Sequence, residues 1–194
     1  ANLLRLHAAQ TALNNGNPEQ TLRVLEDIPQ SALPADQQIR FSELQATSAM
    51  ALGDNVTALT AIKHPSLEQL DIRPLPEQLR IQQLRADILD ANGQYIEAAR
   101  ERVFIHSLLA PSQQTANNQA IWDSLTQAKT KTLQTASDGA SGEFAGWLEL
   151  ALITRNQRNL DLQVRALKAW KESHATHPAA NRLPDSIQQI EALQ

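Results

Sequence analysis

The stretch Asn14-Asn15-Gly16-Asn17-Pro18 decides the fold, because it ends one helix and begins the next. Gly16 suits the left-handed backbone position that closes a helix at its C-terminus. Asn17 can cap the following helix, and Pro18 fits its first position, where no N–H donor is needed. The stretch therefore predicts a helix–turn–helix pair.

The glycine turn recurs at a spacing typical of a repeat. Gly53 follows Gly16 by 37 residues, and Gly93 follows Gly53 by 40. That spacing fits a unit of two helices with linkers of variable length. A fourth unit can be aligned with Arg158 in the place of the glycine. We therefore expect three regular units and one divergent unit.

Small residues stand at fixed distances from these turns. An alanine precedes each turn position by seven residues, and the position five residues after the turn should return to contact the first helix. Closely crossing helices need small side chains at both places, although Gln163 and Arg158 depart from this rule. The positions that we expect to be structural are Ala9, Gly16, Ala46, Gly53, Ala58, Ala86, Gly93, Ala98 and Ala151.

These offsets resemble the tetratricopeptide pattern, whose helices carry small residues and a turn glycine at similar places. The large aromatic residues of that pattern are mostly missing. The predicted fold class is all-α, a tetratricopeptide-like array of helix–turn–helix repeats (α-solenoid) with about ten helices. The alternative is an irregular helical bundle in which the alanines align by chance.

Apolar residues recur with a helical period along almost the whole chain. Residues 112–141 do not fit the repeat, and they predict an inserted polar helix. The segment Ser-Asp-Gly-Ala-Ser-Gly at 137–142 is expected to be a loop. It would separate repeats in 1–136 from a last repeat in 142–194 of one continuous array. The expected helices are 2–14, 18–28, 34–52, 55–63, 76–91, 94–110, 113–135, 142–156, 159–175 and 184–192.

Composition excludes several classes of protein. Aromatic residues make up only 4% of the 194 residues, so the core must be built from aliphatic side chains, which suits packed helices. The net charge of −4 lacks the basic excess that nucleic-acid binding needs. The absence of cysteine excludes disulfides and zinc–thiolate sites. No apolar run reaches the length of a membrane span. Residue 1 is Ala and not Met, so we expect a processed chain or part of a longer one.

No catalytic motif is found, and we expect a protein that is not an enzyme and holds no cofactor or metal. His174 and His177 are close enough in sequence to touch one metal ion. A histidine that contacts free carbonyls at a helix end is the more common arrangement. Glu143 and Glu149 are six residues apart, which places them on different helix faces as solvated side chains.

Two tryptophans and a group of basic residues mark the last unit. Trp147 and Trp170 could form a platform for a ligand, but such residues more often anchor paired helices. The basic side chains could face an anionic partner, but charges spread over two helices are usually solvated. These basic residues are Arg155, Arg158, Arg165, Lys168 and Lys171.

A family resemblance is found in the same unit. The segment Gly146-Trp147-Leu148-Glu149-Leu150-Ala151-Leu152, then Trp170, then the run from His177 to Pro184, resembles the end of the N-terminal domain of the LpoA/LppC lipoproteins. The segment Leu22-Arg23-Val24-Leu25 is compatible with the same family. The resemblance covers the chain in architecture and about 45 residues in motif.

The resemblance implies a function. Members of this family are outer-membrane lipoproteins that face the Gram-negative periplasm and activate class A penicillin-binding proteins in peptidoglycan synthesis. It implies a tetratricopeptide-like scaffold that contacts the synthase or peptidoglycan, held at the membrane only through an upstream lipid anchor. For the segment from His177 to Ala180 we expect a structural role, in which Pro178 starts a turn or short helix.

Two other functions stay open. The chain could be the α-superhelical domain of a peptidoglycan-cleaving lytic transglycosylase, which would require a catalytic Glu in a cleft. It could also be a cytosolic regulator that binds a peptide in the groove of its repeats.

Overall fold

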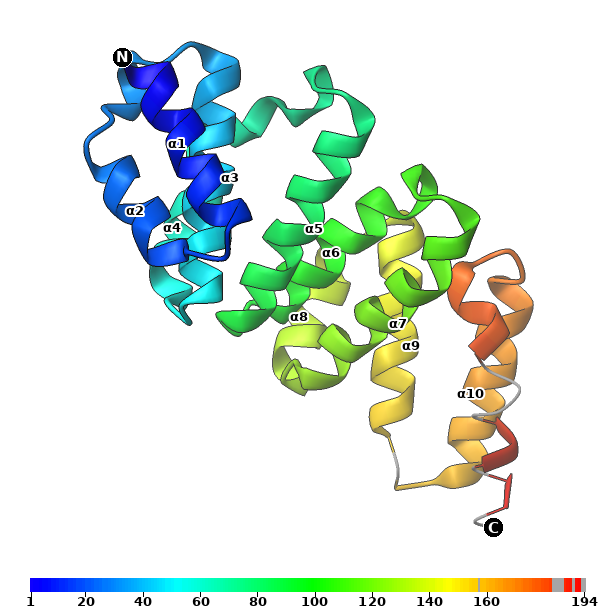
Figure 1. Cartoon of the computed structure of the whole chain (residues 1–194). Coiled ribbons are helices and arrows are strands. Elements are labelled where there is room, and N and C mark those ends of the chain that lie inside the picture. Colours follow the sequence, from blue (N-terminus) through cyan, green and yellow to red (C-terminus); the bar gives the residue numbers. More distant parts are fainter. Residues whose placement is uncertain (157, 183–186, 190, 193–194) are drawn as a thin grey trace. The chain divides into compact units, whose positions relative to one another are not determined.

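The computed structural model describes residues 1–156, 158–182, 187–189 and 191–192. These residues form helices and no β-strand, so the predicted all-α class is confirmed. By their contacts the residues divide into two compact units, Ala1–Gln94 and Tyr95–Gln194 (Figure 1). Each unit has its own buried core.

The first unit consists of two helical hairpins followed by a fifth helix. Helix α1 packs on α2 and α3 packs on α4, while α3 also contacts α1, α2 and α5. Short 3-10 helices lie in two of the connections. The elements are α1 (Asn2–Asn14), α2 (Pro18–Glu26), η1 (Gln30–Ala32), α3 (Ala35–Ala51), α4 (Asn55–Ile62), η2 (Pro65–Ile72) and α5 (Leu75–Ala91).

The three glycine turns have the same backbone geometry. Gly16, Gly53 and Gly93 have φ angles of 75°, 75° and 74°. In the first turn the Gly16 N–H donates to the carbonyl three residues earlier, and the next N–H donates to the carbonyl five residues earlier, both at 2.9 Å. The other two turns repeat these bonds at 3.0 and 2.9 Å. This is the Schellman motif, and it satisfies carbonyls that a helix end leaves free.

A side-chain cap begins the second helix of each hairpin in this unit. The Asn17 side chain accepts a hydrogen bond from the Gln20 N–H at 3.1 Å. The Asp54 carboxylate accepts one from the Thr57 hydroxyl at 2.6 Å and one from the Thr57 N–H at 3.1 Å. These bonds lower the pKa of Asp54 below its ordinary value. Turn and cap together fix where each hairpin reverses.

The core of the first unit is largely aliphatic, with small residues between its helices. Ala9, Ala46, Ala58 and Ala86 are fully buried. Thr21 is also buried at the position where the other hairpin has Ala58, and its hydroxyl donates to the Ala9 carbonyl at 3.2 Å. A polar residue is tolerated there because the facing helix supplies its hydrogen-bond partner. Around these lie the larger core residues Leu6, Leu25, Ile28, Leu33, Phe41, Leu44 and Ile81.

The second unit packs around two tryptophans. Helices α7, α8 and α10 each contact α9, and α6 packs on α7. Ala98 and Ala151 are buried here. The elements are α6 (Tyr95–Ile105), η3 (His106–Leu108), α7 (Pro111–Gln127), α8 (Thr130–Gly139), α9 (Gly142–Arg155), α10 (Leu160–Ser173) and η4 (Pro178–Arg182).

The single inserted helix predicted over 113–135 is wrong, because the structure has two helices there. Ala128 is extended, with ψ of 147°, and ends α7. The carbonyls freed by this break at Leu125 and Thr126 accept hydrogen bonds from the Arg155 guanidinium at 2.8 and 3.2 Å. Ala128 itself is buried. A side chain 30 residues away in sequence therefore stabilises the break.

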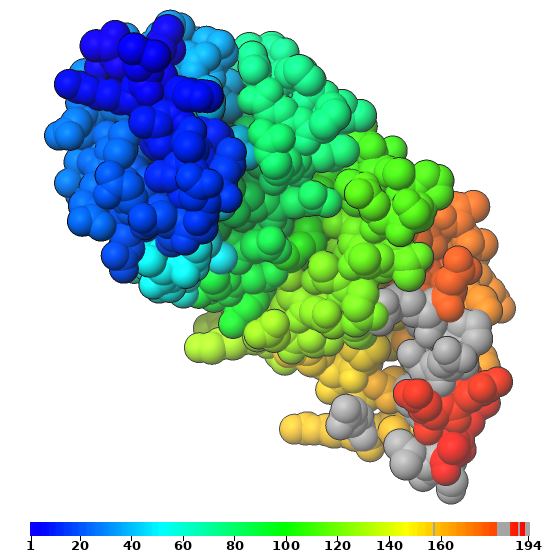
Figure 2. Space-filling view, in the orientation of Figure 1, coloured from blue at the N-terminus to red at the C-terminus, as the bar shows by residue number. Residues whose placement is uncertain are grey.

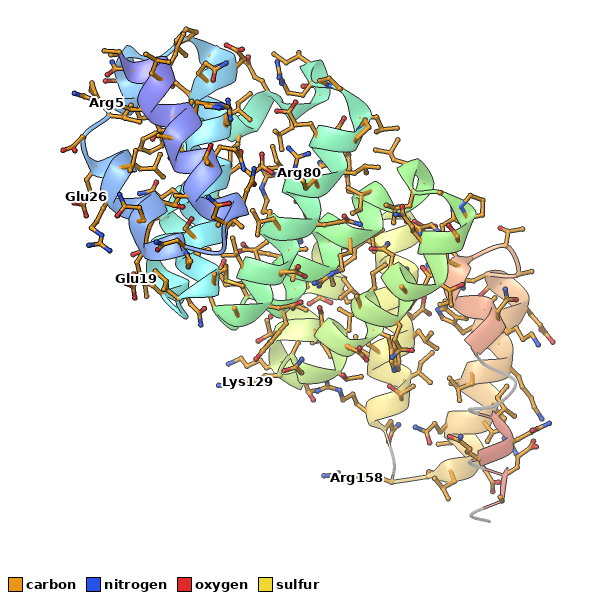
Figure 3. The ribbon with its side chains drawn as sticks, viewed as in Figure 1. Arg5, Glu19, Glu26, Arg80, Lys129 and Arg158 are labelled. Carbon is orange, nitrogen blue, oxygen red and sulfur yellow. The ribbon has the colours of Figure 1, made fainter. Side chains whose placement is uncertain are left out.

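The fourth turn also differs from the glycine turns. Arg158 does not have a positive φ, and its side chain points away from α9 and α10 (Figure 3). Asn159 caps α10 by accepting a hydrogen bond from the Leu162 N–H at 3.1 Å. Gln163, at the position of Thr21, is buried and donates to the carbonyls of Ile153 and Thr154 at 3.2 and 3.0 Å. The fourth unit thus satisfies a polar residue at the helix crossing in the same way.

Several predicted boundaries change. The loop expected over 137–142 is shorter, because α8 continues to Gly139 and α9 begins at Gly142. As a domain division that loop stays a prediction, and the division by contacts falls between residues 94 and 95. The helix predicted over 94–110 ends at Ile105 and continues as η3. Of the helix predicted over 184–192, residues 184–186 and 190 lie outside the described residues, and residues 187–189 are helical. In the described part of the chain, no helix has the length and apolarity to cross a bilayer.

Candidate interaction surface

A groove opens on the first unit, lined by α1, α3 and α5. Its volume is about 660 Å³, within the range typical of ligand sites. Three leucines give it apolar patches, and the remaining lining is polar or charged. The lining residues are Gln10, Leu13, Asp36, Gln37, Arg40, Glu43, Leu44, Thr47, Arg73, Glu77, Arg80 and Leu84.

Two walls of the groove are each formed by one face of a helix, α3 for one wall and α5 with the turn before it for the other. Lining residues recur on α3 at steps of four, three and four residues, and the same steps recur in α5 and the turn before it. This period keeps side chains on one face of a helix. The α3 series is Asp36, Arg40, Glu43 and Thr47, and the other series is Arg73, Glu77, Arg80 and Leu84.

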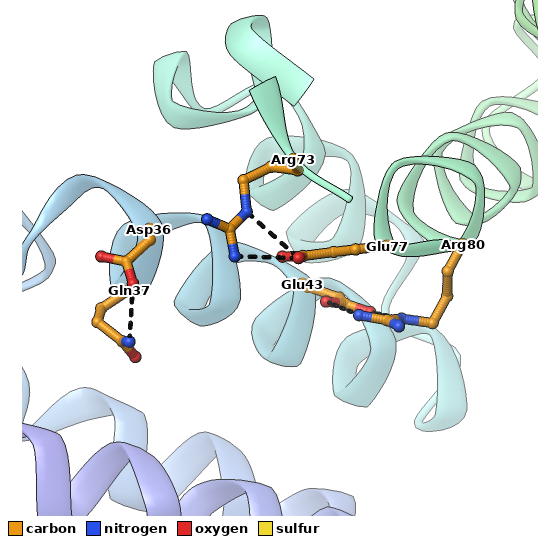
Figure 4. Close-up of polar contacts among 6 residues, drawn as sticks. All are labelled: Asp36, Gln37, Glu43, Arg73, Glu77 and Arg80. Carbon is orange, nitrogen blue, oxygen red and sulfur yellow. Dashed lines mark hydrogen bonds and ion pairs between the residues drawn. The ribbon is translucent and has the colours of Figure 1, made fainter. Parts of the chain in front are cut away.

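Two ion pairs hold the charged side chains of the groove. The Arg80 guanidinium reaches from α5 to Glu43 on α3 and donates to both of its carboxylate oxygens, one at 3.0 Å (Figure 4). These bonds raise the pKa of Arg80. Arg73 donates through Nε and Nη2 to Glu77 at 3.2 and 3.0 Å. The two-fold contact of Arg80 is the stronger kind of charge-assisted bond and ties α3 to α5.

Arg40 is the remaining arginine of the groove. It is half-buried on α3, one helical turn after Asp36 and one before Glu43. The carboxylate of Asp36 accepts its hydrogen bond from Gln37 at 3.2 Å, and Glu43 is engaged by Arg80. Among the described residues Arg40 has no hydrogen-bond or ion-pair partner. Its guanidinium therefore faces the groove with its donors unsatisfied by the residues that the structure describes.

Helix α1 forms one wall of the groove and lies at the surface of the unit, in dark blue in Figure 2. The N-terminal end of α1 exposes Leu3 and Leu4, whose side chains are 55% and 77% accessible to solvent. Arg5 ties this end to the chain after α2 by donating to the Asp27 carbonyl at 3.2 Å. Helix α1 thus lines the groove with Gln10 and Leu13 and exposes apolar side chains near its other end.

The residues singled out from the sequence do not line this groove. The structural alanines are buried between helices, and the glycines close the turns. The groove residues were missed, because charged residues on a helix face usually signal only solvent exposure. The sequence did contain an indication of the groove, because mostly charged residues recur at the same spacing on α3 and on α5 with the turn before it.

The tryptophans of the last unit are core residues and not a ligand platform. Trp147 is fully buried, and Trp170 is 2% exposed. The Trp170 indole N–H donates to the Gly146 carbonyl at 3.0 Å, which joins α10 to α9. Trp122 lies against Trp147, with ring centroids 6.4 Å apart. The structure therefore confirms their prediction as packing anchors.

His174 and His177 pack against these rings. His174 stacks on Trp170 at 4.5 Å and its Nδ1 lies 3.0 Å from the Trp170 carbonyl, as expected of a histidine at a helix end. His177 Nδ1 accepts a hydrogen bond from the Ala179 N–H at 3.0 Å, so its Nε2–H donates to the Glu143 carbonyl at 2.7 Å. Both ring nitrogens of His177 are thus used, in the neutral form. Burial lowers its pKa.

These contacts hold η4 against the unit. Ala179 and Ala180 are buried, and the short helix begins at Pro178, as predicted for this segment. Gly146 leaves the room that this packing needs, because a Cβ there would lie 2.9 Å from the His177 ring. In the described residues no three histidine, aspartate or glutamate side chains gather as metal ligands.

The basic residues of the last unit do not form one site. Arg155 donates to carbonyls at the end of α7 and to the Thr130 hydroxyl at 3.2 Å. Lys168 pairs with Glu191 at 3.1 Å. Glu143 and Glu149 are both exposed, as expected. The groove of the first unit is therefore the candidate interaction surface.

Comparison with known families places the whole chain in one of them. The family described as "LppC putative lipoprotein" matches residues 1–194. A curated relative, the penicillin-binding protein activator LpoA of Vibrio cholerae serotype O1, is 26% identical over 194 residues. The match covers 96% of this chain and 31% of the relative. The chain thus spans about a third of the length of that relative.

Solved structures share the fold. Full-length LpoA from Haemophilus influenzae superposes with a TM-score of 0.65 at 22% identity, over 96% of this chain and 34% of that one. The N-terminal domain of the same protein gives a TM-score of 0.64 at 22% identity, over 98% of this chain and 85% of that domain. The helical array described above is therefore the fold of an LpoA N-terminal domain.

Proposed function

The chain belongs to the LppC lipoprotein family, and on that premise we propose that it is a non-catalytic scaffold domain which helps a lipoprotein activate a class A penicillin-binding protein. The observation that carries the proposal is the match of the family along the whole chain, since the curated relatives are named as penicillin-binding protein activators. Activation itself would belong to the longer protein, because this chain spans about a third of its relatives.

The groove on the first unit is the surface that we assign to the partner. Repeat arrays commonly bind through the face made by their first helices. Here that face carries charged side chains and two half-buried leucines, whereas Trp147 and Trp170 are buried in the second unit. Binding at this groove would position the partner without any chemistry by the chain.

We place the longer protein at the periplasmic face of a Gram-negative outer membrane, held there by a lipid on a residue upstream of this chain. The support is the lipoprotein description of the family. The upstream coding sequence provides a direct test. An export signal followed by a lipid-attachment cysteine is expected, and a cytosolic start would overturn this placement and favour the peptide-binding regulator.

The catalytic alternative, a domain of a lytic transglycosylase, finds no support in the groove. A glutamate that donates a proton to a glycosidic bond is typically set in an apolar pocket. Glu43 and Glu77 are instead engaged by Arg80 and Arg73. Incubation of the chain with purified peptidoglycan should release no muropeptides, and their release would revive this alternative.

Direct binding tests the proposal. The periplasmic region of a class A penicillin-binding protein from the same organism should bind the immobilised chain, while an unrelated helical-repeat domain should not retain it. Removal of residues 1–194 from the full-length protein should also weaken activation in cells. Full activation after this removal, together with no binding in vitro, would reduce the domain to a spacer.

A further inference from the structure

The charges of the groove are unevenly satisfied. Arg80 and Arg73 each have a carboxylate from this chain at hydrogen-bond distance. Arg40 lies on the same wall as Glu43 and has no such partner in the described residues. A half-buried guanidinium that keeps its donors free is a site at which a ligand can supply the missing acceptor.

The chemistry of this acceptor follows from the guanidinium. Arginine presents a planar fork of N–H donors that matches the two oxygens of a carboxylate. A strongly anionic polymer does not fit, because the three arginines of the groove are balanced by its three carboxylates and leave no net positive charge. A basic segment fits less well, because Glu43 and Glu77 are already taken by arginines and Asp36 already accepts a hydrogen bond from Gln37. One isolated carboxylate is therefore the preferred partner.

The surroundings of Arg40 restrict the ligand further. Leu13 on α1 and Leu84 on α5 are half-buried and offer apolar contacts, while Leu44 on α3 is buried in the core. Gln10, Gln37 and Thr47 are uncharged and can exchange hydrogen bonds with a peptide backbone. The groove thus combines apolar contacts, neutral polar groups and one free cation.

We propose that this groove binds an extended segment of the partner protein that carries one acidic side chain between apolar or neutral residues, with the carboxylate on Arg40. This inference rests on the proposed function, in which the groove is the contact surface. It adds the chemical class of the segment and the residue that recognises it.

A pair of peptide arrays tests whether binding requires an acidic side chain in the segment. Overlapping peptides that cover the periplasmic region of the penicillin-binding protein are made twice, once with their natural acidic residues and once with Asn and Gln in their place. The chain should bind a few peptides of the first array and lose them in the second. Binding that is equal on both arrays would overturn the role of the carboxylate.

Variants of the chain test whether Arg40 recognises the segment. Binding of the periplasmic region to Arg40→Ala should be about tenfold weaker than to the wild type, and weaker still to Arg40→Glu, with the same thermal midpoint. Arg23 is exposed on α2 outside the groove, so Arg23→Ala is the matched control and should stay within roughly twofold. Equal binding by Arg40→Ala and wild type would overturn the inference while leaving the proposed function intact. No binding by the wild type would refute both.

One further measurement distinguishes the two possible sources of the carboxylate, a partner protein and peptidoglycan. Peptidoglycan also carries peptides with free carboxylates, so the same variants are sedimented with purified peptidoglycan. Binding of the wild type to peptidoglycan that is lost in Arg40→Ala would reject a segment of a partner protein. Sedimentation that is independent of Arg40 supports the protein segment.

Discussion

The two compact units use their polar and aromatic residues in opposite ways. The first unit leaves charged side chains of α3 and α5 around an open groove and packs its interior with aliphatic residues. The second unit buries two tryptophans and sets two histidines against them. The first unit thus presents a charged groove, in which Arg80 also ties α5 to α3, whereas the second unit uses its rings to join helices.

This difference assigns binding to the groove residues of the first unit and stability to the buried rings of the second. Replacing a groove residue should change what the first unit binds while leaving its fold intact. Replacing a ring in the second unit should destabilise its fold, because each ring is packed on several sides and some are hydrogen-bonded. The segment from Gly146 to Leu152, which carries the family resemblance together with Trp170, therefore belongs to a structural core and not to a contact surface. The following changes test this division.

Truncation of Trp170 should have the largest effect. The side chain is 2% exposed and its indole bonds the Gly146 carbonyl. Trp170→Ala should lower the free energy of unfolding by about 3–5 kcal/mol, measured by urea denaturation. Trp170→Phe, which keeps much of the packing, is the control and should lose less. A loss below about 1 kcal/mol for the alanine variant would show that the ring is not a core anchor.

A methyl group at Gly146 should have the next largest effect. The added Cβ would lie 2.9 Å from two atoms of the His177 ring and 3.2 Å from His174. Such overpacking costs about 1–3 kcal/mol, so the thermal midpoint of Gly146→Ala should fall. At Gly139 no atom lies within 4 Å of the added Cβ, so Gly139→Ala is the matched control. Equal stability of the two variants would contradict the packing described for η4.

The glycine turn and the divergent turn can be compared directly. Gly53 has a φ of 75° and open space around it, so only backbone strain opposes a side chain there. Gly53→Ala should therefore cost about 1–2 kcal/mol by chemical denaturation. Arg158→Gly should give no gain, because the backbone of Arg158 is not left-handed. A clear stabilisation by Arg158→Gly would show that the fourth turn strains its backbone like a glycine turn without the glycine.

The second unit should weaken in acid through His177. Burial lowers the pKa of this histidine in the folded state. As pH falls through the ordinary histidine value of about 6.5, the unfolded chain takes up a proton that the folded chain resists. The stabilising contribution is therefore complete above that pH and is lost below it. Protonation would also break the bond from the Ala179 N–H.

This pH dependence is measured as the urea midpoint between pH 5 and 8. The charged groups that act on His177 are Glu143, His174 and His106. His177→Gln should flatten the decline, whereas His7→Gln, at an exposed site, should leave it unchanged. A decline of the same size in both variants would assign the effect to other groups.

The turns were predictable because they depend on residues close in sequence. A glycine followed by a capping Asn or Asp fixes where a helix stops and the next starts, and the bonds at Gly16 and Gly53 join neighbours within five residues. The burial of Trp147 and Trp170 was also predicted, because they lie on the two helices of the last unit and aromatic residues there usually anchor paired helices.

The features that were not predicted depend on distant partners. The break at Ala128 is stabilised by Arg155, and no Gly or Pro marks it. The groove arises only when α3 and α5 bring Glu43 and Arg80 together across 37 residues of sequence. A sequence shows that such residues are charged, but it does not show which of them remain without a partner.

The most direct test of the account is hydrogen–deuterium exchange of the chain with and without the periplasmic region of the penicillin-binding protein. Binding at the groove predicts slower exchange in α1, in residues 36–47 of α3 and in residues 73–84, with α9 and α10 unchanged. Slower exchange confined to α9, α10 and η4 would place the contact on the second unit and contradict the division between a binding unit and a structural unit.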